Sequence, residues 1–572
     1  MRYISVIVVA VCLCGVLGGV LVPGAVVAMV THGSKESVSG KYLAANYAYK
    51  QQHLDAAARV LLRALEKNPN DTQLLSESYV TLLYAGQVQQ AIEHAKRYRN
   101  LKPDDTNLLI DVLDALEAFK QERYVDSSAL LEAMTKAMSQ QTILGINKVM
   151  LPYLLVWSEM GKGAYDQATL VMDALIGDEN KGAHFLYFQA GLVYDMIGNH
   201  AKAAKFYERS IANYHPPYRY IKAIGNFYER QQDIKRAREL YSQYQLSQPH
   251  VTFFKDDLER LDKRQLATKP FIMTPTEGLS EMFAEAARVL YSADLRLEAM
   301  AYMHMVLYIN PHHYDIIDLL GSHYELNQQY TKAVEAYQLM DKSSDYYWPS
   351  RVYIQENRYL SGEKMAACKE LLALGNRKET SYLARVTLAD LLRSDHHYEH
   401  AVVIYDRILK DLNVIKPSHW GLYFARGVSY ERTGRWPRAE EDFLYALTLR
   451  PQQPDVLNYL GYSWIDRNVH LEQATHMLQE AVRQRPGNAQ IVDSMGWALY
   501  KQQDYERAAM YTERALELLP DDAVINDHLG DIYWHQGRKN EAEFQWKRAL
   551  KYPSSMISSE LLQEKITHGI LD

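Results

Sequence analysis

The stretch from Gly427 to Pro451 reads GVSYERTGRWPRAEEDFLYALTLRP, and its markers return along the chain at an almost constant step. The glycine is followed by Gly461, Gly496 and Gly530, at steps of 34, 35 and 34 residues. The alanine of this stretch, Ala439, returns as Ala474, Ala508 and Ala542, and its proline returns as Pro486 and Pro520. A fixed period of this length is typical of chains built from repeated supersecondary units.

The residue types in this pattern predict a pair of antiparallel helices. Glycine in the first helix and alanine in the second leave room for two helices joined by a tight turn to approach closely. Larger side chains three residues after each glycine fill the seams, namely Tyr430, Trp464, Leu499 and Tyr533. Proline cannot continue a helix, so it ends the second helix and starts the next connection. We call the two helices of a unit helix A and helix B.

The same pattern extends toward the N-terminus. Pro69 and Pro103 are 34 residues apart, and Ala57 and Ala91 hold the helix B position before them. Further units are marked by Gly191 with Ala203, Gly225 with Ala237, and Gly321 with Ala333. The sequence therefore predicts an all-α superhelical solenoid of about fourteen helix pairs.

Residues 252–279 break this period, because they carry two prolines and lack the glycine and alanine markers. We predict a connecting joint here, between an N-terminal array at 31–251 and a C-terminal array at 280–556. Residues 557–572 are predicted to form a polar capping helix, since a terminal repeat must cover its open face.

Residues 1–30 have the pattern of a targeting segment. Arg2 precedes an uncharged stretch from Tyr3 to Val30, which predicts either a signal peptide or an N-terminal membrane anchor. Pro23-Gly24 and the small residues that follow favour cleavage after Ala28, whereas the length of the apolar stretch favours an uncleaved anchor. In both cases Arg2 stays on the inner side, and the body of the chain lies outside the cytoplasm.

The composition is that of a folded and mildly acidic chain, with 23% charged residues, 48% hydrophobic residues and a net charge of −7. Phosphate binding needs concentrated Lys and Arg, so this balance argues against nucleic acid as a partner. The chain has no Gly-rich phosphate loop and no cysteine pair with zinc spacing. We therefore expect no cofactor, no metal site and no catalytic residue.

These markers resemble those of the tetratricopeptide repeat (TPR) family over nearly all of the chain after residue 37. The runs Trp420–Arg432, Pro454–Arg467, Ile491–Tyr500 and Ile525–Gly537 are similar to recurring segments of exported proteobacterial TPR proteins, which include periplasmic and lipoprotein adaptors. The resemblance implies a superhelix that binds protein partners, often as an envelope assembly factor or adaptor. It implies no catalytic residues.

In TPR arrays helix A lines the concave face, so the resemblance places a partner on that face. The corresponding positions of three C-terminal repeats are Asn458, Tyr462, Asp493, Trp497, Tyr500, Asp527, Asp531 and Trp534. Carboxylates that alternate with exposed rings suit a ligand with basic and apolar side chains. A second interpretation stays open, in which some rings pack between neighbouring helices and the acids are merely solvated.

Two further patterns resemble binding sites but do not predict one. Lys222 and Asn226 hold the first two positions of a carboxylate clamp known from some TPR domains, but residues 252–279 replace the repeat that would complete it. The histidine-rich stretch 396–400 falls on a turn between helix A and helix B, where polar residues are expected, so it does not predict a metal site.

The leading hypothesis from the sequence is a non-enzymatic scaffold or adaptor of the bacterial envelope that binds protein or peptide partners. It is expected in the periplasm, free or tethered to the inner membrane, and it contacts membrane only through an uncleaved N-terminal segment. Two alternatives stay open: an envelope-maintenance tether that contacts membrane or cell wall, and an enzyme with a site near the 252–279 joint.

Overall fold

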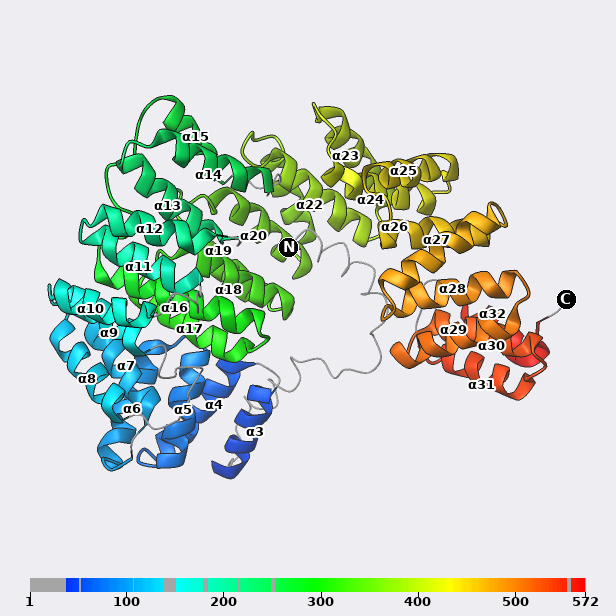
Figure 1. Cartoon of the computed structure of the whole chain (residues 1–572). Helices are drawn as coiled ribbons and strands as arrows, with labels where there is room; N and C mark the ends of the chain where they lie inside the picture. The colour runs from blue at the N-terminus through cyan, green and yellow to red at the C-terminus, as the bar shows by residue number, and fades with distance from the viewer. Residues whose placement is uncertain are drawn as a thin grey trace. The chain divides into compact units, whose positions relative to one another are not determined.

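The computed structural model of the chain describes residues 38–50, 53–105, 107–137, 151–177, 184–212, 215–247, 253–552 and 557–570 (Figure 1). Within these ranges every regular element is a helix, α3 to α32 and one short 3₁₀ helix, η1. No helix of the described residues is both long and apolar enough to cross a membrane. The predicted signal or anchor at 1–30 lies outside the described residues.

The helices belong to two compact units, which we describe separately. The described residues of Val27–Ala367, with Lys378–Thr380, form what we call the N-terminal unit. Cys368–Arg377 and the described residues from Ser381 onward form the C-terminal unit.

The N-terminal unit begins with six helix pairs and continues with a single helix and further pairs. The first six pairs are α3 (Val38–Lys50) and α4 (Leu54–Lys67), α5 (Thr72–Tyr84) and α6 (Val88–Leu101), α7 (Leu108–Lys120) and α8 (Tyr124–Ala137), α9 (Leu151–Gly161) and α10 (Tyr165–Ile176), α11 (His184–Met196) and α12 (His200–Ile211), and α13 (Tyr218–Arg230) and α14 (Ile234–Ser247). Then follow α15 (Lys255–Asp262), α16 (Pro275–Ser292), α17 (Arg296–Ile309), α18 (Tyr314–Leu326), α19 (Tyr330–Gln338), α20 (Tyr347–Leu360) and α21 (Lys364–Leu374), whose last turns belong to the C-terminal unit.

The C-terminal unit continues the pairing without interruption. Its elements are α22 (Ser381–Ser394), α23 (Tyr398–Asp411), η1 (Pro417–His419), α24 (Trp420–Arg432), α25 (Trp436–Leu449), α26 (Pro454–Asp466), α27 (Leu471–Gln484), α28 (Ala489–Lys501), α29 (Tyr505–Leu518), α30 (Ala523–His535), α31 (Lys539–Ala549) and α32 (Ser559–His568). Across the described chain the helices make fourteen pairs plus the single helices α15 and α32, so the predicted all-α solenoid of about fourteen pairs is confirmed.

The marker glycines lie where helix A meets a large ring of helix B. A Cβ atom added to Gly191 would come within 2.4 Å of the Tyr207 ring, and one added to Gly530 would come within 2.4 Å of the Trp546 ring. The marker alanines, such as Ala203 and Ala542, are completely buried. The close approach predicted from the sequence is therefore real, and at these glycines the room is taken by an aromatic side chain rather than by the alanine.

The described residues of the predicted joint pack onto the last helix pair of the first array. Phe254 is completely buried and stacks on Tyr241, with ring centroids 4.8 Å apart. Arg260 pairs with Glu229, and the backbone N–H of Ala267 donates to the same carboxylate at 2.8 Å. This stretch lies within the N-terminal unit, and the division into units falls near Ala367 instead.

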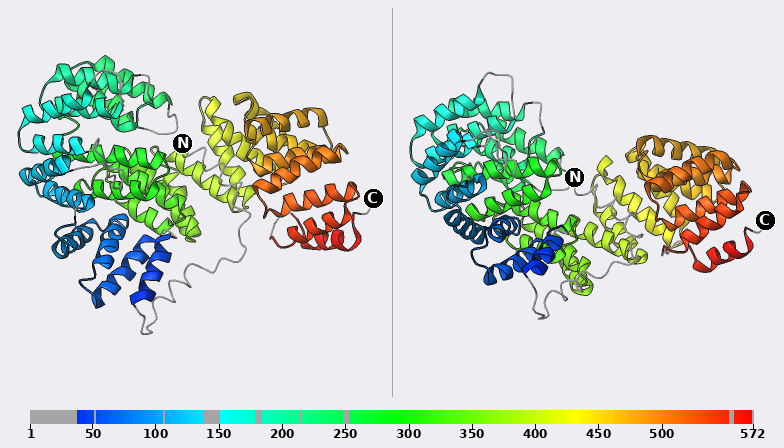
Figure 2. Two further views of the ribbon diagram at one scale, coloured as in Figure 1. Left: turned by 60° about the horizontal axis from the view of Figure 1, so that its bottom comes forward. Right: turned by 90° about the horizontal axis from the view of Figure 1, so that it is seen from below.

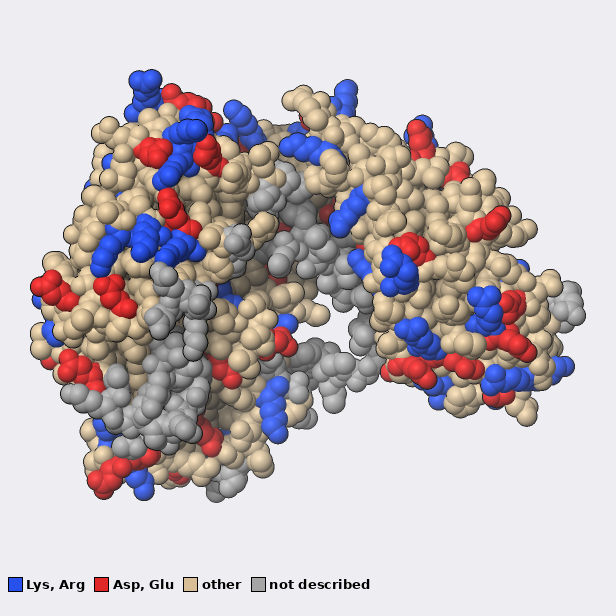
Figure 3. Space-filling view, in the orientation of Figure 1, with Lys and Arg blue, Asp and Glu red and all other residues tan. Residues whose placement is uncertain are grey.

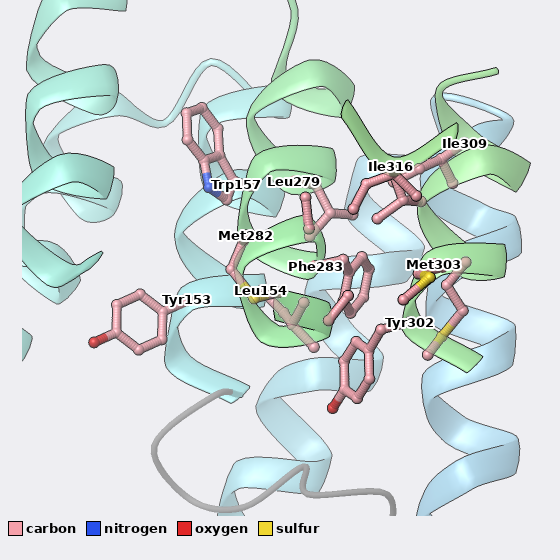
Figure 4. Close-up of a cluster of buried hydrophobic side chains, with 14 of the residues drawn as sticks. Tyr153, Leu154, Trp157, Leu279, Met282, Phe283, Tyr302, Met303, Ile309 and Ile316 are labelled. Carbon is pink, nitrogen blue, oxygen red and sulfur yellow. The ribbon is translucent and has the colours of Figure 1, made fainter. Parts of the chain in front are cut away.

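Helices α16 and α17 lie on the inner side of the array that precedes them (Figures 1 and 2). They contact α5, α7, α9 and α11, the A helices of four pairs. Figure 4 shows the resulting core, in which Leu154 and Trp157 of α9 meet Leu279, Met282 and Phe283 of α16. The inner side of these four pairs is therefore filled by the chain itself.

Candidate protein-binding surface

We call the side of each unit that is lined by its A helices the helix-A face. In the N-terminal unit this face is covered along much of its length by α16 and α17. Trp157 lies against Gly278 of α16, where an added Cβ would come within 2.2 Å of the indole ring. Tyr308 of α17 donates to Gln89 at 2.7 Å and lies under the ammonium group of Lys120, 3.5 Å from the ring centroid. A partner segment has no room to bind along this part of the face.

A buried ion network fixes this arrangement. Arg219 of α13 donates through Nε to Glu281 of α16 at 2.9 Å, and His313 lies 3.2 Å from the same carboxylate. Glu281 and His313 are fully shielded from solvent. Burial alone would raise the pKa of Glu281, but Arg219 and His313 outweigh it and hold that pKa below its ordinary value.

The helix-A face of the C-terminal unit is built differently, and Tyr462 and Tyr500 are only half-buried on it. Helices α26, α28 and α30 contact their own repeat partners and each other, and no helix pair of the described C-terminal unit covers them as α16 and α17 cover the N-terminal face. The eight predicted site residues lie on these three helices: Asn458 and Tyr462 on α26, Asp493, Trp497 and Tyr500 on α28, and Asp527, Asp531 and Trp534 on α30. The structure therefore places them on one series of neighbouring A helices.

Trp497 and Tyr500 of this face make a series of ring contacts with two histidines of α30. Trp497 lies parallel to His528, with ring centroids 4.0 Å apart, and to Tyr500, with centroids 4.7 Å apart. Tyr500 then meets His535 at 5.3 Å. Trp497 is 9% exposed, whereas Tyr462 and Tyr500 are half-buried, so the tyrosines present more surface than the tryptophan.

The carboxylates of this face are buried and paired within the chain. Asp493 accepts a hydrogen bond from His528 at 2.8 Å, and both side chains are shielded from solvent. Burial alone would lower the pKa of His528, but the Asp493 carboxylate outweighs it, so that pKa is raised. His528 therefore carries a positive charge at higher pH than an exposed histidine.

A lysine from the C-terminal helix neutralises the other two acids. Lys565 of α32 donates to Asp527 at 2.7 Å and to Asp531 at 2.8 Å, and Trp546 donates to Asp531 at 2.9 Å. Burial raises the pKa of Asp527, to which the neighbouring Asp531 adds, while Lys565 opposes both. Trp534 is packed between Trp546 and Gly569, so its ring lies in a helix seam rather than open on the face.

Sequence reasoning missed the two cations of this site. Lys565 lies 34 residues after Asp531, so one more step of the repeat period places it beside the acidic positions. His528 follows Asp527 directly in the sequence and is 35 residues from Asp493, which it contacts. The repeat spacing is the signal that identifies both residues.

Three polar atoms of this face have no hydrogen-bond partner among the described residues. They are Oδ1 of Asn458, Oδ1 of Asp493 and Nε1 of Trp497, and all three are buried. A buried polar atom without a partner is costly, so this region has unused hydrogen-bonding capacity for water or for a ligand.

The two residues of the incomplete carboxylate clamp make contacts within the chain. Lys222 pairs with Asp257 at 2.6 Å and with Asp345 at 3.2 Å, and Asn226 donates to the carbonyl of Lys269 at 3.1 Å. The first half of the carboxylate clamp is therefore occupied by the chain itself. Among the described residues, no group of three His, Cys, Asp or Glu is placed to hold a metal ion.

Comparison with known proteins identifies the repeat. Residues 386–454, 467–523 and 494–555 match a family profile described as tetratricopeptide repeat, and residues 186–214 match a second profile of the same description. A TPR repeat-containing protein of Pseudomonas aeruginosa is 30% identical over 115 residues, which is 20% of this chain and 19% of that protein. Interferon-induced protein with tetratricopeptide repeats 2 of Cricetulus griseus is 29% identical over 109 residues, 18% of this chain and 23% of that protein.

These alignments span about a fifth of the length of the two curated relatives. Among solved structures, the APC/C Cut9–Hcn1 hetero-tetramer aligns with 96% of this chain and 99% of its own, at 13% identity and a TM-score of 0.39. Yeast Tom70 aligns with 93% of this chain and 95% of its own, at 13% identity and a TM-score of 0.33. The matched stretches, residues 186–214 in one unit and 386–454 and 467–555 in the other, are therefore tetratricopeptide-type repeats.

Proposed function

We propose that this protein is a non-enzymatic scaffold or adaptor of the bacterial envelope that binds protein or peptide partners on the helix-A face of its C-terminal unit. TPR folds typically bind protein partners. The observation that carries the proposal is the contrast between the two helix-A faces. One is filled by α16 and α17, and the other presents half-buried rings beside buried acids.

The rings of this face supply the contact area that protein recognition uses. Tyr462 and Tyr500 offer large side chains with few rotatable bonds and a polar tip, the residue type that is enriched at binding hot spots. Asp527 and Asp531 are neutralised by Lys565 within the chain, so a basic side chain of a partner pairs with them in place of that lysine.

A location outside the cytoplasm is part of the proposal. It is supported by the sequence of residues 1–30, in which a single arginine precedes a long uncharged stretch. A reporter enzyme that is active only after export, fused behind residue 30, tests the location. Mass spectrometry of the mature N-terminus separates cleavage after Ala28 from an uncleaved anchor. A reporter that is active only in the cytoplasm contradicts the location.

Partner capture from cell envelopes, with crosslinking, tests the binding surface. We expect a recurrent protein partner that is lost when Tyr462 and Tyr500 are both changed to alanine. Phe544→Ala is the matched control, because Phe544 is 58% exposed on helix B of the last pair, away from this face. Circular dichroism melting curves of all variants establish that they fold. A partner that is lost equally in the control, or retained by the Tyr462 and Tyr500 variant, contradicts the proposal.

A further inference from the structure

The C-terminal helix α32 binds the last repeat through a short and specific pattern. Leu562 is 3% exposed, and Gly569 comes so close to Trp534 that an added Cβ would lie 2.1 Å from the indole ring. Ile566 and Ile570 pack against the same core as Leu562. Together with Lys565 these residues form the pattern L-x-x-K-I-x-x-G-I.

Lys565 supplies the polar part of this contact. Its ammonium group lies between Asp527 and Asp531, at 2.7 and 2.8 Å, and its side chain is only 13% exposed. Two carboxylates of the same helix face would repel each other in a buried site without a cation between them. The last repeat therefore needs a positive charge at this position, and in the free protein α32 provides it.

Helix α32 makes few buried contacts with the last repeat. Leu562 is its one completely buried apolar side chain, and Leu561, Gln563 and Glu564 point into solvent. A helix of 10 residues is too short to be stable without its contacts, and elements with few buried contacts open most readily. The place of α32 is thus accessible to a competing segment.

Unused polar atoms extend the site beyond α32. Asp493, which His528 links to α30, keeps its Oδ1 without a partner, and the indole N–H of Trp497 is also unsatisfied. Trp497 is nine-tenths buried and stacks on His528, next to Asp527 in the chain. A bound segment that reaches from α30 toward α28 would find both a hydrogen-bond donor and an acceptor there.

We propose that the last repeat is a docking site for an amphipathic helix of a partner protein, with a lysine as its charged anchor, and that α32 occupies this site in the free protein. The proposal rests on the proposed function, since it names the kind of partner that the last repeat takes, against α31 and beside Asp527 and Asp531 of α30. The partner helix places its lysine between Asp527 and Asp531 and its apolar side chains where Leu562 and Ile566 lie. Binding then requires α32 to leave, so the affinity for a partner is reduced by the occupancy of α32.

The test uses full-length protein and a fluorescent synthetic peptide of residues 557–570 as the probe helix. One receptor is the wild-type chain, and the other carries Leu562→Ala and Lys565→Gln, which weaken its own α32. We expect fluorescence anisotropy to show at least about tenfold tighter binding of the probe to the second receptor, since its site is more often free. Equal binding to both receptors overturns the proposal.

Two controls establish the role of the lysine. A probe with Lys565→Gln is expected to bind at least about tenfold more weakly, and the weakened receptor with Asp527→Asn is expected to lose the probe to a similar degree. A glutamine probe that binds as well as the lysine probe overturns the proposal. Hydrogen exchange of the wild-type chain gives a second measurement that does not depend on the variants. Saturating probe must speed exchange in α32 and leave α22 unchanged, and an unaltered α32 overturns the proposal.

Competition separates this inference from the proposed function. If the inference holds, excess probe releases a partner that was captured through Tyr462 and Tyr500. A captured partner that stays bound while the probe binds overturns the inference and leaves the proposed function intact. A wild-type chain that dimerises, and that the probe returns to monomer, makes a second copy the occupant and also overturns it.

Discussion

At the scale of single residues, tyrosine explains how neighbouring repeats are joined. The hydroxyl group of Tyr194 on helix A donates to Asp173 on the preceding helix B at 2.5 Å, and Lys202 donates to the same carboxylate at 3.0 Å. Tyr228 and Tyr533 repeat this contact with acids of their own preceding repeats, at 3.1 and 2.8 Å. Phenylalanine fills the same seam but cannot make the hydrogen bond, which favours tyrosine at these positions in a chain of 43 Tyr and 12 Phe.

Tyr194→Phe tests this role of the hydroxyl group. We expect the free energy of unfolding to fall by about 1 kcal/mol, the usual net contribution of one hydrogen bond. Urea denaturation followed by circular dichroism measures the change. Tyr165→Phe serves as the control, because Tyr165 is 49% exposed, and we expect no measurable loss there. Equal stability of Tyr194→Phe and wild type contradicts the role.

Gly530→Ala tests the close approach within a repeat. The added Cβ meets the ring of Trp546, which is 1% exposed and cannot move aside freely. We expect a loss of about 1–3 kcal/mol from overpacking, seen as a lower midpoint of thermal unfolding. Gly487→Ala is the matched control, since its Cβ meets nothing within 4 Å. If both variants have the same midpoint of thermal unfolding, the Trp546 ring is not the reason that position 530 requires glycine.

At the scale of helices, the sequence predicts where the helices lie along the chain, but it does not predict which helix pairs turn inward and pack on other pairs. The glycine, alanine and proline markers around Gly427 and Ala439 fix the helix pairs, because each marker reports a contact inside one pair. The same markers cannot tell whether a helix pair continues the solenoid or turns inward. Helices α16 and α17 form an ordinary helix pair, and yet they fill the helix-A face of the N-terminal unit. The pattern places the eight site residues on α26, α28 and α30. Its period also puts Lys565 one step after Asp531, but only the structure shows that Lys565 pairs with both Asp527 and Asp531.

Gly278→Ala tests the inward packing of α16. Its Cβ would collide with Trp157, whose indole N–H is already held by Gln189 at 3.0 Å. We expect a loss of about 1–3 kcal/mol and faster hydrogen exchange in both α9 and α16. Val289→Ala, at a position of α16 that is 57% exposed, is the control and leaves exchange in α9 unchanged. Faster exchange confined to α16 argues against the contact as the cause.

At the scale of the whole molecule, His304 and His323 of the N-terminal unit and His528 of the C-terminal unit are expected to respond to pH in opposite directions. Burial lowers the pKa of His304 to about 4 and that of His323 to about 4, with Lys332 adding to both effects. Both histidines lie in the N-terminal unit and stay neutral in the fold, while the unfolded chain takes up protons below its pKa of 6.5. The stability that these two neutral histidines contribute to the fold is fully present above pH 6.5 and is lost as the pH falls toward 4.

The pKa of His528 is shifted the other way, so its pairing with Asp493 is complete below pH 6.5 and is lost as the pH rises through the raised value. From pH 7.5 to 5.5 we expect each of the two N-terminal histidines to cost about 1 kcal/mol. Relative to the intrinsic exchange rate at each pH, amide protection should fall in α17 and α18 and rise in α28 and α30. His528→Gln removes the second effect and leaves the first. Parallel changes in both units contradict this assignment.

The inward packing of α16 and α17 also bears on how the chain acquires its structure. In the C-terminal unit each helix meets neighbours close in sequence, so repeats can form and open one after another, as in a nearest-neighbour chain. In the N-terminal unit, α16 meets α9 and α17 meets α5, which are separated by more than a hundred residues. These long loops must close before their contacts stabilise anything, which raises the contact order and slows folding. Removing helices from the end of the C-terminal unit therefore shortens an array, whereas removing α16 and α17 exposes the core of all the repeats that they touch.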